Sequence, residues 1–105
     1  MKHIKLMPDY DCHPLWHHQS KEVGNIDPET LGISSSLVRR LNSWQQEYNQ
    51  TQNREDPIRS GFSEKETEAA FVAVGYKLAH DLNQELPSVN IVYYDISKQS
   101  EFGIE

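Results

Sequence analysis

The densest group of potential metal ligands in the chain is one cysteine with three histidines: Cys12, His13, His17 and His18. Thiolate sulfur and imidazole nitrogen are ligands that zinc and copper prefer in proteins. The spacing is not that of a zinc finger, because the chain has no second cysteine and because the adjacent His17 and His18 point apart in a helix or a strand. The group also offers a nucleophile, since a thiolate beside an imidazolium is activated. A small metal-binding or hydrolytic protein that uses this cluster is therefore our alternative hypothesis.

Two pairs of neighbouring carboxylates, Asp9 with Asp11 and Glu55 with Asp56, are candidates for acid–base chemistry or for binding a divalent cation. Both pairs lie among turn-forming residues, where Asp is common, and no glycine-spaced calcium loop surrounds them. Three more acids open an expected helix: Glu64, Glu66 and Glu68. Negative charge there is favourable against the helix dipole. The same acids offer a docking patch to a basic partner.

The overall charge argues against nucleic acid as a direct ligand. The chain carries 10 basic and 16 acidic side chains, for a formal net charge of −6, which repels a phosphate backbone. An acidic surface instead steers the association of basic proteins. The sequence contains no glycine-rich phosphate loop, serine elbow or dinucleotide fingerprint. We therefore expect a protein-binding protein that is not an enzyme and that uses no cofactor and no metal.

Several features favour a cytoplasmic protein without a membrane segment. Cys12 is the only cysteine, so no internal disulfide forms. No apolar run approaches the roughly 20 residues of a membrane span, and Lys2, His3 and Lys5 occupy the place of a signal peptide's apolar stretch. A chain of 105 residues suits one hydrophobic core. We expect a single domain over 1–105, with an ordered core over 1–96 and a frayed polar tail over 97–105.

The beginning of the chain predicts one strand and then a long irregular segment. Residues 3–7 alternate polar and apolar side chains, which is the pattern of a half-buried strand, and Pro8 ends it. Prolines and glycines interrupt residues 9–33 too often for a long helix. We expect an ordered loop region there, which is either a functional surface or contains a short strand or helical turn. We prefer the functional surface.

The middle of the chain predicts the first of two helices. Ser34, Ser35 and Ser36 offer N-caps for a helix over 35–51. The apolar positions fall on one helical face: Leu37, Leu41, Trp44 and Tyr48. We expect this face, including both of its aromatic residues, to pack in the core.

A second helix follows a cluster of turn formers over 53–62. Ser63 with Glu66 matches a capping box at its beginning, and Pro87 ends it. The apolar positions of this helix are Ala70, Phe71, Val74, Leu78, Leu82 and Leu86. Gly75 costs the helix about 1 kcal/mol relative to Ala, but it permits close approach of the first helix.

Residues 89–94 form the most β-prone run of the chain. The order of strand, loop, helix, helix and strand predicts an α+β fold of two layers, in which two antiparallel helices cover a small sheet. A long ordered N-terminal loop region completes it. A sheet of only two strands leaves its edges exposed unless the loop region adds a strand.

Several short segments carry a family resemblance: Leu6-Met7-Pro8-Asp9-Tyr10, Cys12, Pro14-Leu15-Trp16, Gly24-Asn25-Ile26-Asp27-Pro28, Asp56-Pro57 and Ser60-Gly61-Phe62. In these segments the chain resembles small bacterial immunity proteins of toxin–immunity systems, including contact-dependent growth inhibition. The resemblance covers most of the chain. It implies a protein that binds the toxic C-terminal domain of a delivered toxin and covers its active site or substrate surface, as a monomer or in a 1:1 heterodimer. It carries over no catalytic or metal-binding residue.

The resemblance and the charge together suggest the kind of toxin and the residues that meet it. Many such toxins are nucleases with basic substrate grooves, which an acidic inhibitor can occupy. Trp16, in the loop region, is freer than the helical aromatic residues to anchor an interface. We expect six residues to face the partner: Asp9, Tyr10, Asp11, Trp16, Glu55 and Asp56.

Overall fold

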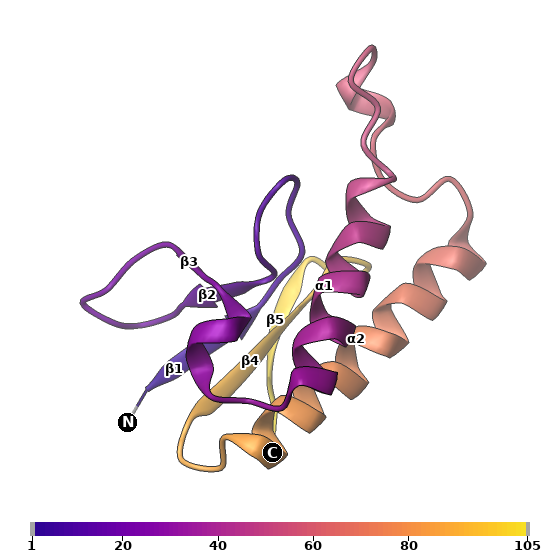
Figure 1. The fold of residues 1–105 in the computed structure, drawn as a ribbon. Helices are drawn as coiled ribbons and strands as arrows, with labels where there is room; N and C mark the ends of the chain where they lie inside the picture. The colour runs from indigo at the N-terminus through magenta and orange to yellow at the C-terminus, as the bar shows by residue number, and fades with distance from the viewer. Residues whose placement is uncertain (1, 105) are drawn as a thin grey trace.

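The computed structural model describes residues 2–104, which fold into one five-stranded mixed sheet and two helices (Figure 1). The strands are β1 (His3–Leu6), β2 (Leu15–His17), β3 (Asn25–Ile26), β4 (Asn90–Asp95) and β5 (Ser100–Ile104). They lie in the order β3-β2-β1-β4-β5. Only β1 and β4 pair in parallel; the other neighbours are antiparallel.

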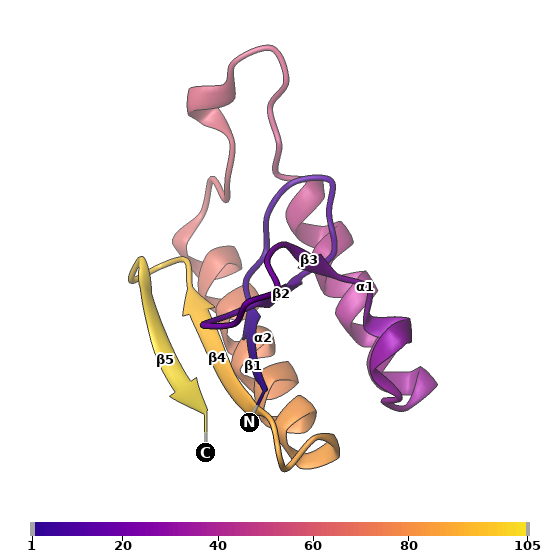
Figure 2. The ribbon, with the colours of Figure 1, turned by 90° about the vertical axis from the view of Figure 1, so that its left-hand side faces the viewer.

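The helices α1 (Ser35–Asn49) and α2 (Lys65–Glu85) run antiparallel and cover one face of the sheet, while the other face stays open (Figure 2). Two short 3-10 helices, η1 (Pro28–Leu31) and η2 (Pro57–Arg59), lie in the connections before each of them. This arrangement confirms the predicted α+β fold with two helices on a small sheet. None of the described helices combines the length and the apolar character that a membrane span requires.

The core lies between the sheet and the helix pair because apolar side chains alternate along the strands. Ile4, Leu6 and Leu15 are buried on one face, as are Ile91 and Tyr93 of β4. The helices contribute Leu37, Leu41, Trp44, Phe71, Leu78 and Leu82. Each such side chain stabilises the fold by about 1.5–3 kcal/mol through burial.

Both helices and the sheet meet at Gly75. A β-carbon at this position would lie 2.7 Å from Cζ2 of Trp44 on α1 and 2.5 Å from Cζ of Tyr93 on β4. The two aromatic side chains are fixed by hydrogen bonds to the backbone of α2, since the Trp44 indole donates to the Phe71 carbonyl at 3.0 Å and the Tyr93 hydroxyl donates to the Val72 carbonyl at 3.1 Å. The expected approach of the first helix at Gly75 is thus made by its Trp44 side chain, and Tyr93 of β4, which the sequence did not connect with Gly75, lies closer still.

The region over 9–33, for which we preferred a functional surface to a short strand or helical turn, contains β2, β3 and η1, so the second alternative is confirmed. The two strands extend the sheet beyond β1, with Leu15 opposite both Leu6 and Ile26. All three of these side chains are buried. Strands of three and two residues are too short to show a period-two pattern, so the sequence did not reveal them.

The end of the chain differs from the predicted frayed tail over 97–105. Ser100–Ile104 form β5, which pairs with β4 along its whole length. A turn that is closed by Asp95 and has Gln99 at a φ of 51° reverses the chain between the two strands. Because β5 is held mainly by backbone pairing and its side chains are largely exposed, its sequence lacks the apolar alternation that predicts a strand.

The second helix begins at Lys65, later than a cap at Ser63 predicts, and its buried face is confirmed only in part. Phe71, Leu78 and Leu82 are buried as expected. The capping box at Ser63 and Glu66 is not formed: α2 begins at Lys65 after Glu64, and no side chain caps it. Ala70 is exposed and Val74 is 47% exposed, whereas Val72 and Ala79 are buried. The approach to the sheet at Gly75 places 72, 75 and 79 inward, and this shifts the buried face away from 70 and 74.

Candidate functional site

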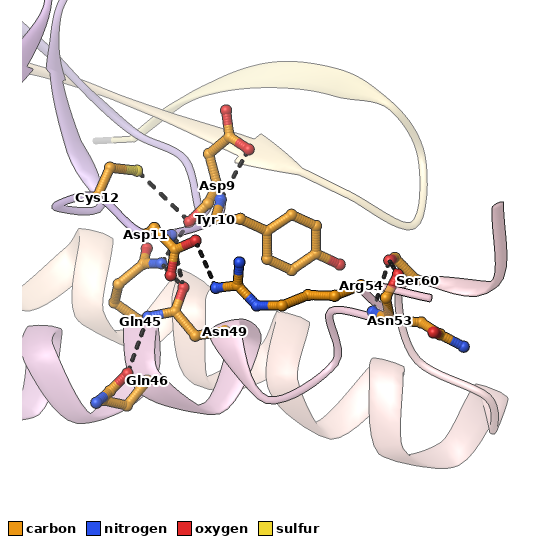
Figure 3. A network of polar contacts seen from close by, with 10 residues as sticks. All are labelled: Asp9, Tyr10, Asp11, Cys12, Gln45, Gln46, Asn49, Asn53, Arg54 and Ser60. Carbon is orange, nitrogen blue, oxygen red and sulfur yellow. Dashed lines mark hydrogen bonds and ion pairs between the residues drawn. The ribbon is translucent and has the colours of Figure 1, made fainter. Parts of the chain in front are cut away.

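A turn near the beginning of the chain packs against the end of α1 (Figure 3). The ring of Tyr10 stacks on Tyr48 with centroids 4.7 Å apart, and its hydroxyl shares a hydrogen bond with Thr51 Oγ1 at 3.0 Å. The backbone N–H of Asp11 donates to Asn49 Oδ1 at 3.0 Å. Asp11 adopts a φ of 57°, a conformation that Asp tolerates better than most residues. The turn is thus held by side chains about forty positions further along the chain.

A buried glutamine on α1 supports this turn from beneath. Gln45 is 4% exposed, and its Nε2 donates both to the Asp9 carbonyl and to Asn49 Oδ1, the latter at 2.8 Å. Asn49 in turn donates to Gln46 Oε1 at 2.8 Å. The chain of amides orients Asn49 so that its oxygen receives the Asp11 N–H. Polar side chains of α1 therefore position the backbone of Asp9 and Asp11.

The loop over 50–64 projects from the body beyond the ends of both helices (Figure 1). The outgoing and returning arms of this loop are joined near its base by the Gly61 N–H, which donates to the Thr51 carbonyl at 3.0 Å. Farther out, the Asn53 N–H donates to Ser60 Oγ at 2.8 Å. The Arg54 guanidinium lies 3.1 Å from the Asp11 carboxylate and links the loop to the turn at 9–12. We call this part of the molecule, residues 9–11 with 47–68, the loop end.

Five of the six residues expected to face a partner lie in the loop end. Asp9 and Glu55 are exposed, while Asp56 is partly exposed and pairs with Arg59 at 3.2 Å. Tyr10 is half-buried under its contacts with α1, and the carboxylate of Asp11 is occupied by Arg54.

Trp16 lies apart from these five residues. It sits on β2 opposite Lys5 and Asn25, and its indole donates to the Met7 carbonyl at 2.9 Å. Trp16 is half-buried, and this hydrogen bond joins β2 to the chain just after β1.

Most of the net charge of the protein gathers in the loop end. Its acidic side chains are Asp9, Asp11, Glu47, Glu55, Asp56, Glu64, Glu66 and Glu68, and its basic ones are Arg54, Arg59 and Lys65. Eight carboxylates against three basic groups give this end a net charge of −5, out of −6 for the whole chain. Two of the arginines are already paired with loop-end carboxylates. The surface therefore presents unpaired negative charge around a partly neutralised loop.

Sequence reasoning missed four residues that shape this site. Gln45 and Asn49 are polar residues within the predicted first helix, and only the fold shows that the turn at 9–12 packs on them. Nothing in the sequence marked Arg54 as part of the site, because Asp11, with which it forms an ion pair, is distant in the sequence. Ile58 did give a signal, since it is an apolar residue between Pro57 and Arg59 in a cluster of turn formers. It is 95% exposed at η2.

A groove of about 770 Å³ lies between the base of the projecting loop and the two helix ends. Glu47 and Thr67 line it from α1 and α2, and Arg54, Arg59 and Phe62 line it from the loop. The ring of Phe62 packs on Phe71 at 4.9 Å, which anchors the returning arm of the loop to the core. The groove is a concave, mixed-charge surface. It lies next to the acidic residues of the loop end outside 51–62, which we call the acidic rim: Asp9, Asp11, Glu47, Glu64, Glu66 and Glu68.

The cluster of Cys12, His13, His17 and His18 is not assembled into a metal site. Within the described residues no three His, Cys, Asp or Glu side chains are grouped so that they could hold a metal ion. His17 lies 3.5 Å from Glu22 and His18 lies 3.6 Å from Glu101, so the two rings have different partners. Burial and the Asp9 carboxylate raise the pKa of the Cys12 thiol, which disfavours the nucleophilic thiolate. The geometry gives the alternative hypothesis no support.

A comparison with models of protein families finds a match for the chain. Residues 2–96 match the Serratia CdiI immunity protein-like family. The match spans the turn at 9–12, α1, the projecting loop, α2 and β4, and so includes the whole loop end. A search of curated proteins finds no significant match. The chain belongs to the Serratia CdiI immunity protein-like family.

Proposed function

We propose that this protein neutralises a cognate toxin by binding its toxic domain, one to one, through the loop end. Membership of an immunity-protein family supports the toxin-neutralising role. The observation that carries the choice of surface is the charge distribution, because a net charge of −5 out of −6 lies in the loop end. A surface of this kind attracts a basic partner and accelerates the encounter.

A basic nuclease fits this surface best as the toxin. Nuclease substrate grooves are lined by basic side chains that bind phosphate, and carboxylates arranged along a rigid edge can occupy the same positions. Bound there, the protein covers the active site or the substrate surface and excludes nucleic acid. The five loop-end residues Asp9, Tyr10, Asp11, Glu55 and Asp56 are the proposed partner-facing set, and Trp16 supports them indirectly through β2. We place this encounter in the cytoplasm.

The first experiment is co-expression with the open reading frame immediately upstream. The C-terminal domain encoded there is expressed with and without this protein, and host growth and co-purification are scored. We expect the toxin domain alone to stop growth and the pair to grow and to co-purify as a 1:1 complex. If the pair neither grows nor co-purifies, the proposed function is wrong for that toxin.

A charge-reversal pair tests the surface. Asp9→Lys with Glu55→Lys changes two exposed carboxylates that form no ion pair with any described residue. We expect the dissociation constant for the toxin domain to rise by about tenfold or more at low salt. The matched control is Glu29→Lys with Glu22→Lys, which makes the same charge change outside the loop end. Equal affinities for the two double variants would rule out the loop end as the binding surface.

A further inference from the structure

The tip of the projecting loop exposes an apolar side chain in an otherwise polar surface. Ile58, in the 3-10 helix η2, is 95% exposed, and the neighbouring Pro57 and Arg59 are exposed as well. The loop stands clear of the body in both ribbon views (Figures 1 and 2). Burying an isoleucine in a partner is worth about 1.5–3 kcal/mol, so a projecting Ile58 provides a compact anchor.

The loop is organised before any partner arrives. Asn53 Oδ1 accepts the N–H groups of Glu55 at 3.1 Å and Asp56 at 2.9 Å, which fixes the chain as it enters η2. The Arg59 N–H donates to the Asp56 carbonyl at 2.9 Å, and the two side chains form an ion pair. A loop that already holds its bound shape loses little conformational entropy on binding.

The charges indicate what the tip enters. Residues 51–62 of the loop are neutral, because Arg54 and Arg59 balance Glu55 and Asp56, whereas the flanking turn and helix ends carry the unbalanced acids. An apolar tip with an acidic rim complements a cleft whose mouth is basic and whose floor is apolar. The acidic rim then speeds association with the partner, and the apolar tip slows its dissociation.

We propose that residues 51–62 form a preformed wedge whose Ile58 inserts into an apolar pocket at the floor of the toxin's basic cleft. This inference rests on the proposed function and deepens it by naming the residue that anchors the complex. It separates the loop end into a steering rim and an inserted tip. Substitution of Ile58 should therefore act on the dissociation rate, while substitution of the rim acts on the association rate.

The test uses the full-length protein and the purified toxin domain in a kinetic binding assay. Ile58→Ala should raise the dissociation constant by about tenfold, mostly through a faster dissociation rate, and Ile58→Asp should raise it further. Val23→Ala is the matched control, because Val23 is 88% exposed in the connection between β2 and β3, outside the loop end. It should leave both rates unchanged. Thermal unfolding of each variant checks that folding is unaffected, as the exposure of both positions leads us to expect.

The outcomes separate the wedge from the proposed function. If the wild type binds and neutralises the toxin but both Ile58 variants bind as tightly as it does, the wedge is wrong and the proposed function stands. If the wild type does not bind the toxin, both fail. If Ile58→Asp changes only self-association of the free protein, measured by sedimentation, the tip contacts a second copy and the wedge is overturned.

Discussion

Asp95 is a buried carboxylate that is satisfied without a cation. It is 1% exposed, and it accepts hydrogen bonds from the Tyr76 hydroxyl at 2.8 Å, from Ser97 through both its N–H and its hydroxyl, and from the Lys98 N–H. Burial alone would raise the pKa of Asp95, but these donors outweigh it and hold the pKa below its usual value. Burial and the hydrogen bond to Asp95 raise the pKa of Tyr76 to about 12. The ionised form of Asp95 therefore closes the turn between β4 and β5.

Replacing this carboxylate by an amide gives a prediction with a defined pH dependence. Asp95→Asn places an NH₂ group among donors, and we expect a loss of about 2–3 kcal/mol in the free energy of unfolding at pH 7. Because the folded pKa lies below the unfolded value of about 3.9, the contribution of ionised Asp95 is complete above that value and is lost as the pH falls through the folded pKa. The difference between wild type and variant should therefore shrink on acidification.

Urea unfolding of both proteins between neutral pH and about pH 3 measures this difference. Glu29→Gln, at an exposed position, serves as the control and should differ little from wild type at any pH. Tyr76→Phe removes one donor and should show a smaller loss at neutral pH. A gap for Asp95→Asn that stays constant down to pH 3 would contradict the assigned role of the charge.

At the scale of elements, the crossing of α1, α2 and β4 has no spare volume at Gly75. Gly75→Ala gains about 1 kcal/mol of helix propensity, yet its β-carbon would lie 2.5 Å from Cζ of Tyr93 and 2.7 Å from Trp44. Both rings are buried and are held by hydrogen bonds to the backbone of α2, so moving them aside would break these contacts. We expect a net destabilisation of about 1–3 kcal/mol in chemical unfolding. Ala73→Gly, at an exposed position of the same helix, is the opposite substitution and should cost about 1 kcal/mol. A more stable Gly75→Ala variant would show that the helices separate easily.

The elements that the sequence predicted are those whose signal lies within the element. The helical spacing of Leu37, Leu41 and Trp44 and the β-prone run around Ile91 specify α1 and β4 by local pattern. The strands β2, β3 and β5 exist because each finds a neighbour in the sheet, and pairing leaves little trace in two to five residues. A short strand within 9–33 could be left open from the sequence, but the positions of these strands could not be predicted. Neither could the start of α2, where the capping propensity of Ser63 is overridden.

The same distinction applies to the candidate site. Asp9, Asp11, Glu55 and Asp56 could be chosen from the sequence because acids among turn formers are exposed in most folds. Their common location could not be chosen, since it depends on the contact of Tyr10 with Tyr48 and of Asp11 with Arg54 across the chain. Trp16 was chosen as a large aromatic residue of the expected loop region, and its pairing on β2 could not be predicted because that strand is so short.

At the scale of the whole molecule, the charge is unevenly distributed. Outside the loop end, eight carboxylates face seven basic side chains, which leaves a net charge of −1 there. Several of these groups pair with one another, as in Arg40 with Asp81 at 2.7 Å, where Arg40 and Lys77 hold the pKa of Asp81 below its usual value. The molecule, with extents of 40 × 26 × 25 Å, thus has an acidic end and a nearly neutral body.

This polarity predicts how salt affects association with the toxin. Charges act over a Debye length of about 10 Å at 0.1 M salt and about 30 Å at 0.01 M, so the acidic end should orient an approaching basic partner only at low ionic strength. We expect the association rate of the wild type to fall steeply between 0.01 and 0.5 M salt, on the order of tenfold or more, while the dissociation rate changes little. Stopped-flow binding at a series of salt concentrations measures both rates.

The variants then distinguish the parts of the surface. Asp9→Lys with Glu55→Lys should flatten the salt dependence of the association rate, because it changes the net charge of the loop end from −5 to −1. Ile58→Ala should keep the wild-type slope and shift only the dissociation rate, since an isoleucine carries no charge. Glu29→Lys with Glu22→Lys alters the net charge of the protein by the same amount but leaves the acidic end intact. If that control flattens the slope as much as the loop-end pair does, the net charge alone sets the encounter and its location on the molecule is irrelevant.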